Sequence, residues 1–104
     1  MREKTVSGTY LIQGESVWLL HRTKHDWYEL PGGKLDAGEA KDPSNPTLDE
    51  LRAVAVREMA EETTGYTHGP LTYIRKIEVM RSPDVHLKSH QWAAKVTRGS
   101  VQIQ

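Results

Sequence analysis

The segment from Thr47 to Gly65 constrains the fold more than any other part of this 104-residue chain. Thr47 and Glu50 have the Thr-x-x-Glu spacing of a capping box, which satisfies free N–H groups at the start of a helix. Apolar residues then recur at helical spacing, at Leu48, Leu51, Ala55 and Met59. Gly65 suits the position just after a helix end. We therefore predict one long amphipathic helix from Leu48 to about Thr64.

The regions on both sides of this helix have the patterns of β-strands. Strands are expected at Lys4–Ile12, Val17–Leu20, Trp27–Leu30, Leu71–Met80, Val85–Val96 and, as the start of another, Val101–Gln104. The run Val17–Leu20 is apolar throughout, which predicts a strand covered on both faces. Strands on both sides of one helix predict an α/β (α+β) fold with a mixed sheet.

Composition and charge exclude several classes of protein. Lys plus Arg and Asp plus Glu both number 14, so no net basic field favours a nucleic-acid coat or a membrane surface. The absence of Cys excludes disulfides and thiolate metal sites. We expect neither a signal peptide nor a membrane span, because the longest apolar run is Val17–Leu20. A single cytoplasmic domain over residues 1–104 is the expectation.

Three glutamates near the end of the predicted helix are unfavourable for helix stability. Glu58, Glu61 and Glu62 project from one face, where like charges repel by roughly a few tenths of a kcal/mol per pair. The helix dipole disfavours anions at this end by roughly 0.3–1 kcal/mol each. One interpretation is a solvated face balanced by Arg57, four residues before Glu61. The other is a site for a hard cation such as Mg²⁺, which prefers carboxylate and carbonyl oxygens.

The glycine-rich segment upstream favours the second interpretation. Gly33 and Glu39, followed by REMAEE from Arg57 to Glu62 and then Gly65, resemble the Nudix hydrolase signature G-x5-E-x7-R-E-U-x-E-E-x-G-U, with U a bulky apolar residue. The preceding LPGGK is similar to the usual lead-in of that family. In such proteins the glycines let the backbone approach a metal and a diphosphate closely, which a Cβ would obstruct.

The resemblance implies a hydrolase that depends on Mg²⁺ or Mn²⁺ and cleaves the diphosphate linkage of a nucleoside diphosphate derivative. An NTP or dNTP, ADP-ribose or a nucleotide sugar would all fit this class. The residues implied in catalysis are Glu58, Glu61, Glu62 and Arg57, with Arg57 orienting the carboxylates. Those implied in metal binding are Glu58, Glu61, Glu62, Glu39 and Gly33. The substrate would contact Gly32, Gly33 and Lys34, and Trp27 and Tyr28 either line a base pocket or pack in the core.

Three features depart from the Nudix pattern. Residues 40–56 separate Glu39 from Arg57, where the pattern has seven residues, and the Pro-rich stretch Lys41–Pro46 predicts a loop outside regular structure. One extra residue precedes Gly65. Only residues 67–104 follow the motif, whereas Nudix domains commonly continue into a second helix. We therefore expect a Nudix-like mixed sheet with one long helix and no second helix.

These departures leave two functions open, the hydrolase and a catalytically weak or inactive Nudix-like module that binds nucleotides or regulates. An incomplete gene product without activity of its own is a third reading. His86 and His90 lie in a strand-like segment without a third ligand, so a structural or surface role is expected for them. A sheet face left bare by a missing helix would favour self-association, so we predict a homodimer with Val85–Gln104 at or near its interface.

Overall fold

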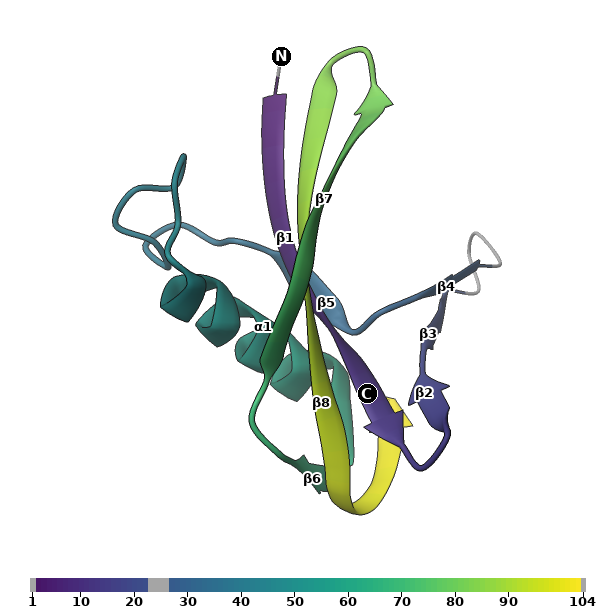
Figure 1. Cartoon of the computed structure of the whole chain (residues 1–104). Coiled ribbons are helices and arrows are strands. Elements are labelled where there is room, and N and C mark those ends of the chain that lie inside the picture. The colour runs from purple at the N-terminus through teal and green to yellow at the C-terminus, as the bar shows by residue number, and fades with distance from the viewer. Residues whose placement is uncertain (1, 23–26, 104) are drawn as a thin grey trace.

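The computed structural model describes residues 2–22 and 27–103, and in them one helix packs against a strongly curled mixed sheet (Figure 1). This confirms the predicted fold class. The elements are β1 (Arg2–Gln13), β2 (Ser16–Trp18), β3 (Leu20–Arg22), β4 (Trp27–Glu29), β5 (Gly32–Lys34), α1 (Leu48–Glu62), β6 (Thr63–His68), β7 (Thr72–Ser82) and β8 (Val85–Ile103). No helix among these residues is long and apolar enough to cross a membrane.

Helix α1 begins where the sequence predicts. The Thr47 hydroxyl accepts a hydrogen bond from the Glu50 N–H at 3.2 Å, and the Glu50 carboxylate accepts one from the Thr47 N–H at 2.9 Å. Residues 41–46 lie outside helices and strands. Glu50 also accepts from the Lys41 N–H at 3.0 Å, so one side chain fixes both the helix start and the first residue of the loop before it.

The end of α1 differs from the prediction because a strand follows at once. The helix ends at Glu62, and Thr63 is already extended, with φ −139° and ψ 153°. Gly65 has a positive φ of 88° inside β6, where a Cβ would lie 2.8 Å from the Ser100 carbonyl oxygen of β8. Gly65 therefore permits a close approach of two strands and does not cap the helix.

Strand β8 is the centre of the sheet. It pairs in parallel with β1, from Arg2↔Val85 to Ile12↔Lys95, and its other edge pairs antiparallel with β7 and then with β6. The predicted extra strand at Val101 is wrong, because β8 continues through this point to Ile103 (yellow in Figure 1). Its last residues follow a bend at Gly99, where φ is 83°.

One face of the sheet carries the core and α1. The core cluster consists of Leu11, Leu51, Ala55, Met59, Leu71, Trp92, Ala94 and Val101. Strand β1 turns Ser7 and Thr9 to this side together with Leu11, and all three are fully buried. The Ser7 hydroxyl donates to the Leu51 carbonyl at 2.9 Å and accepts from the Trp92 indole N–H at 2.9 Å, so its burial is compensated.

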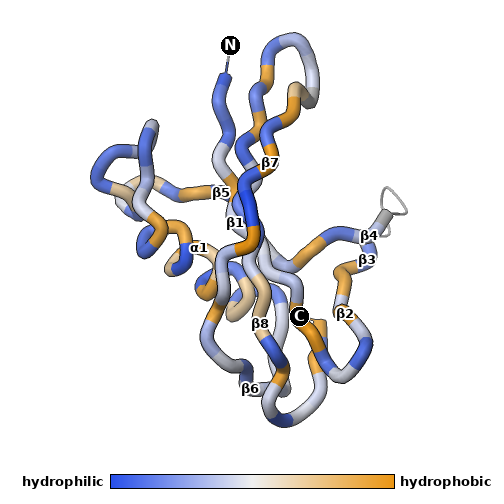
Figure 2. Tube along the Cα trace, viewed as in Figure 1, coloured by the Kyte–Doolittle hydropathy of each residue, from blue (hydrophilic) through white to orange (hydrophobic). Residues whose placement is uncertain are grey.

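The opposite side of the sheet, which we call the open face, is covered by no helix of the described residues. Strand alternation and register place on it Val6, Gly8 and Tyr10 of β1, Leu87, Ser89 and Gln91 of β8, and Ile77 and Val79 of β7. Figure 2 shows apolar and polar positions alternating along the β7–β8 hairpin. The open face is therefore of mixed polarity and includes several partly exposed apolar side chains.

The prediction that Val17–Leu20 is one strand covered on both faces is wrong. Pairing with β1 stops after Trp18, and Leu20 belongs to β3, which pairs with β4 in a separate two-stranded sheet. Leu20 is buried, whereas Val17 and Leu19 are 45% and 44% exposed. Strand β2 lies at the edge of the main sheet, so only one side of this apolar run faces the protein interior.

The capping box gives a direct test of the helix start. Replacing Thr47 with Ala removes an acceptor for the Glu50 N–H and should lower the free energy of unfolding by about 1 kcal/mol. Thr47→Ser keeps the hydroxyl and should stay close to wild type. Urea unfolding followed by circular dichroism measures both, and equal stability of Thr47→Ala and wild type would contradict the capping assignment.

Candidate functional site

One guanidinium joins the loop after β5 to α1. Arg57 Nε and Nη2 bind the two oxygens of Glu39 at 2.7 Å each, a bidentate pair. Arg57 Nη1 contacts Glu58 at 2.9 Å and Glu61 at 3.1 Å. Nη2 also donates to the Lys34 carbonyl at 3.1 Å. The Arg57 side chain thus holds Glu39, the end of β5 and two helix carboxylates in one arrangement.

Two carboxyl groups beside Arg57 have pKa values shifted in opposite directions. The hydrogen bonds from Arg57 lower the pKa of Glu39, and the Asp36 N–H, 2.7 Å away, adds to this. Burial raises the pKa of Glu58, although Arg57 partly opposes the effect. The Glu58 side chain is only 13% exposed. The negative charge of Glu58 is therefore less well compensated than that of Glu39.

Two glycines bring the backbone of β5 against the helix glutamates. The Gly32 N–H donates to Glu62 at 2.8 Å. A side chain at Gly33 would collide with the Glu58 carboxylate, and a Cβ at Gly32 would lie 2.6 Å from the Ser7 carbonyl oxygen. Only glycine leaves the carboxylate and the neighbouring strand in place at these positions.

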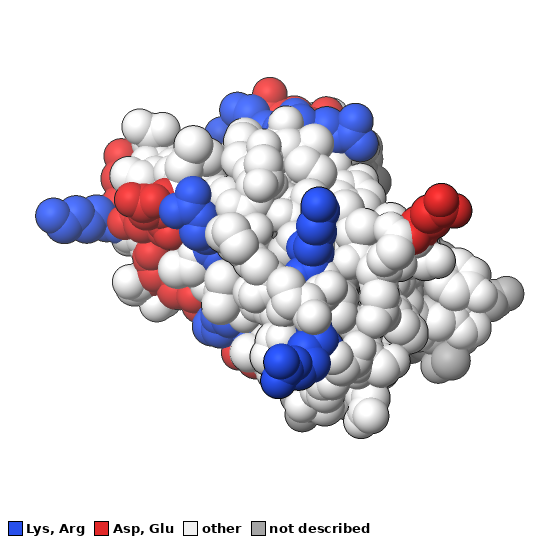
Figure 3. Space-filling model, turned by 60° about the horizontal axis from the view of Figure 1, so that its bottom comes forward, with Lys and Arg blue, Asp and Glu red and all other residues white. Residues whose placement is uncertain are grey.

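The structure brings together the residues that the motif implied. The site contains Glu39, Arg57, Glu58, Glu61 and Glu62, with Gly32, Gly33 and Lys34 on the adjoining strand. Figure 3 shows acidic side chains gathered on the same side of the molecule on which Figure 1 places α1.

Tyr28, one of the two aromatic residues before the glycines, is not part of this cluster. Tyr28 is 66% exposed and stacks on His21 with ring centroids 4.7 Å apart, and it does not line the pocket described below. The side chain of Trp27 lies outside the described residues. A base-pocket role for either ring stays a prediction.

The Glu39, Glu58 and Glu61 carboxylates bind Arg57 and are not grouped around a common metal position. Among the described residues, no three His, Asp or Glu side chains are arranged to hold a metal ion. The donor chemistry nonetheless fits a hard divalent cation, because the Glu58 and Glu62 carboxylates lie beside the β5 backbone and Arg57 links Glu61 to Glu58. A cation here would also stabilise the buried charge of Glu58, which the protein compensates only in part.

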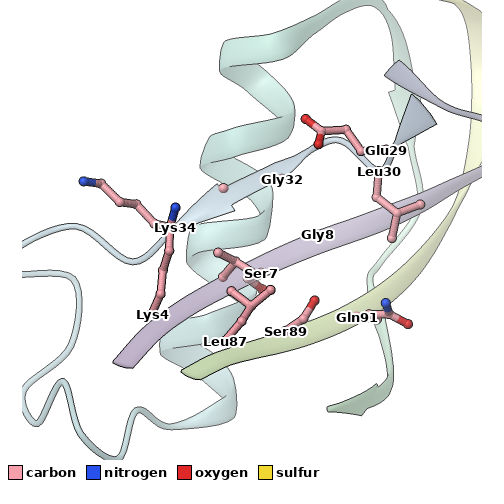
Figure 4. A pocket seen from close by; sticks show the side chains of 12 residues that line it. Lys4, Ser7, Gly8, Glu29, Leu30, Gly32, Lys34, Leu87, Ser89 and Gln91 are labelled. Carbon is pink, nitrogen blue, oxygen red and sulfur yellow. The ribbon is translucent and has the colours of Figure 1, made fainter. Parts of the chain in front are cut away.

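A pocket of about 440 Å³ lies next to the glycines, on the open face (Figure 4). Lys4 and Lys34 line one end, and Gln91 lies at the other. Between them are Val6, Gly8, Leu30, Leu87 and Ser89. Sequence analysis found Gly32, Gly33 and Lys34 of this lining but missed the β1 and β8 residues. The strand alternation of β1 and β8 was a signal for their common face, but nothing local showed that the two strands pair.

Solved structures of Nudix hydrolases share this fold. The chain is similar to a MutT Nudix hydrolase from Burkholderia pseudomallei, with a TM-score of 0.72 and 17% identity over 99% of this chain and 74% of that one. The ORF135 protein of E. coli has a TM-score of 0.66 and 21% identity over 100% of this chain and 69% of that one. A Nudix-family hydrolase from Clostridium perfringens has a TM-score of 0.63 and 14% identity over 94% of this chain and 71% of that one. No family model and no curated protein sequence matches the chain. The chain therefore has the Nudix fold, with low sequence identity to its structural neighbours.

The pair between Glu39 and Arg57 predicts a pH-dependent loss of stability. Because the pKa of Glu39 is lowered in the folded state, its stabilisation is complete above the ordinary value of 4.5 and is lost as the pH falls through the lowered value. Glu39→Gln should cost about 1–3 kcal/mol at neutral pH and progressively less in acid. Urea unfolding in metal-free buffer at several pH values measures the difference.

Glu61→Gln is the matched control, because Glu61 contacts the same guanidinium but is 56% exposed. It should change stability by less than about 0.5 kcal/mol. If Glu39→Gln behaves like Glu61→Gln at every pH, the bidentate pair does not stabilise the fold.

Proposed function

We propose that this chain is a divalent-metal-dependent hydrolase of the Nudix family that cleaves the diphosphate linkage of a nucleoside diphosphate derivative. The main support is the close approach of Gly33 to the Glu58 carboxylate, inside a Nudix fold and beside a pocket of nucleotide size. A purely structural helix end would gain nothing from a buried carboxylate pressed against a glycine.

The carboxylates and the β5 backbone would bind the metal ion. Glu58, Glu61 and Glu62 supply carboxylate oxygens and Gly33 a carbonyl oxygen, which together form the hard donor set that Mg²⁺ or Mn²⁺ accepts. A bound ion of this kind polarises a phosphoryl oxygen and lowers the pKa of an attacking water. Arg57 stays protonated, because its pairs with Glu39, Glu61 and Glu58 raise its pKa.

In this proposal Glu39 orients the guanidinium rather than binding the metal. Both of its oxygens already accept hydrogen bonds from Arg57, and one also accepts from the Asp36 N–H. Arg57 in turn fixes Glu58 and Glu61 from the side. This orientation restricts the carboxylates to a few rotamers, which favours a fixed coordination geometry when an ion binds.

The pocket suits the rest of the substrate. Lys4 and Lys34 make no ion pair among the described residues, and both line the pocket beside the glycines. An ammonium group without a carboxylate partner is available for a phosphate. The phosphate chain would lie along Gly32, Gly33 and Lys34, and the nucleoside would extend over Gly8 toward Gln91 (Figure 4).

A nucleotide-binding module without turnover is the second candidate. The observation that favours it is the position of Arg57, whose Nη1 bonds to Glu58 and Glu61 and so occupies the space between two proposed ligands. A module of this kind would keep the pocket and bind nucleotides without cleaving them.

An assay of product release tests both candidates. We expect phosphate or nucleotide release from at least one of a panel of dNTPs, ADP-ribose, nucleotide sugars and dinucleoside polyphosphates, and its loss when EDTA removes the metal. Glu58→Gln or Glu62→Gln should lower turnover by at least roughly 10–100-fold without loss of the fold. Glu15→Gln, in the exposed turn after β1, is the control that should stay active. No hydrolysis with any divalent metal would refute the enzyme and leave the module.

We also propose that the chain self-associates as a homodimer. Partly exposed apolar residues on β7, namely Ile74, Val79 and Met80, support this. Strand β8 pairs on both edges, so contact through side chains is favoured over exchange of this strand. Sedimentation equilibrium at micromolar concentration should give twice the monomer mass, and a cooperative, well-folded monomer would contradict the proposal.

A further inference from the structure

The amide of Gln91 has a fixed orientation at the far end of the pocket. Its side-chain oxygen accepts a hydrogen bond from Arg75 Nε at 2.9 Å and from the Tyr10 hydroxyl at 3.2 Å. A guanidinium has donors only, so the amide atom facing Arg75 must be the oxygen. Arg75 of β7 lies opposite Gln91 of β8 in the strand register, and Tyr10 lies two residues along β1 from Gly8, the β1 partner of Gln91.

The amide nitrogen of Gln91 therefore points away from Arg75 and toward the interior of the pocket, as Figure 4 shows. Its two N–H groups donate to no other residue in the described part of the chain. Gln91 is partly buried at the pocket wall, and with its oxygen held by Arg75 and Tyr10 its amide N–H groups are left to donate to an acceptor on a ligand in the pocket.

The surroundings of the amide suit a flat ring. Gly8 contributes no side chain to the floor, where a Cβ would lie 3.3 Å from the Pro31 carbonyl oxygen. Leu30 and Leu87 supply apolar walls, and the two lysines lie at the opposite end. A ligand with a phosphate at the lysine end would thus place a planar group beside Gln91.

We propose that Gln91 is a specificity-determining residue that donates a hydrogen bond to a carbonyl oxygen of the nucleobase. The inference rests on the proposed function only in taking the pocket as the nucleoside site. A base with a carbonyl group at the recognised edge accepts this bond, whereas one with an exocyclic amino group there offers a second donor. The pocket therefore prefers hypoxanthine or guanine to adenine and uracil to cytosine. Arg75 and Tyr10 are positioning residues, because they act through the orientation of Gln91.

Binding of nucleoside monophosphates tests the inference without any need for turnover. Isothermal titration of the full chain in metal-free buffer compares IMP with AMP and UMP with CMP, pairs that exchange one carbonyl for one amino group. We expect the carbonyl member of each pair to bind about three- to tenfold more tightly, the ratio expected for one hydrogen bond.

Two variants and one control separate recognition from a general loss of binding. Gln91→Glu keeps the shape and the bond to Arg75 but removes the donor, so the preference for IMP over AMP should disappear. Arg75→Met should also reduce the preference for IMP over AMP. Without Arg75 only the Tyr10 hydroxyl contacts the amide, and because a hydroxyl can donate or accept, it does not fix which amide atom faces the pocket. Lys76→Met is the control, because it removes the same charge from the next residue of β7. Lys76 pairs with His90, on the other face of the sheet from Gln91, so this variant should keep the wild-type ratio of IMP to AMP binding.

Equal binding of IMP and AMP by the wild type, binding of neither, or an unchanged ratio in both Gln91→Glu and Arg75→Met would overturn the inference. Hydrolysis is measured separately on the same samples. Preferential binding of IMP without hydrolysis of any diphosphate would refute the enzyme and support the role of Gln91. Hydrolysis without a base preference would support the enzyme and refute that role.

Discussion

The bidentate pair between Arg57 and Glu39 is the contact on which the arrangement of the site depends. It connects the loop after β5 to the last turns of α1, and the same guanidinium fixes Glu58 and Glu61. The pair forms although residues 40–56 are more numerous than the Nudix signature allows. The extra residues lie in the loop 41–46 and in the first turns of the helix, which starts at a capping box well before Arg57. The insertion therefore lengthens the connection without displacing its two ends.

Local signals predicted the elements that local chemistry determines. The start of α1 and the irregular loop before it followed from Thr47, Glu50 and two prolines, because a capping box and a proline act within a few residues. The end of the helix was less accessible. Thr63 leaves the helix to pair with Ile103 of β8, a contact that no nearby residue announces. The prediction of one continuous strand over Val17–Leu20 was wrong for the same reason, because the burial of an apolar run depends on which strand lies beside it.

The residues of the site also fall into those that local sequence predicts and those that strand pairing brings together. Spacing within one helix, together with the motif, was enough to place Glu58, Glu61 and Glu62 beside Arg57. The pocket was not accessible in this way, because Lys4 and Gln91 come from distant strands that the parallel pairing of β1 with β8 brings together. Sequence alternation indicates which residues share a face of one strand. It does not indicate which strands are neighbours, and the shape of a pocket depends on that.

The residues at the end of α1 are unfavourable for helix stability, and this supports a cation-binding role. The last turn of α1 contains no basic residue, and its carboxylates lie where the helix dipole disfavours them. Burial raises the pKa of Glu58, whose carboxylate lies where any side chain at Gly33 would collide with it. Arg57 offsets part of this negative charge, and one guanidinium bears only one positive charge. The remaining negative charge lies next to Lys4 and Lys34, which form no ion pair with any other described residue. This is the electrostatic arrangement expected of a site that binds a metal ion together with a phosphate.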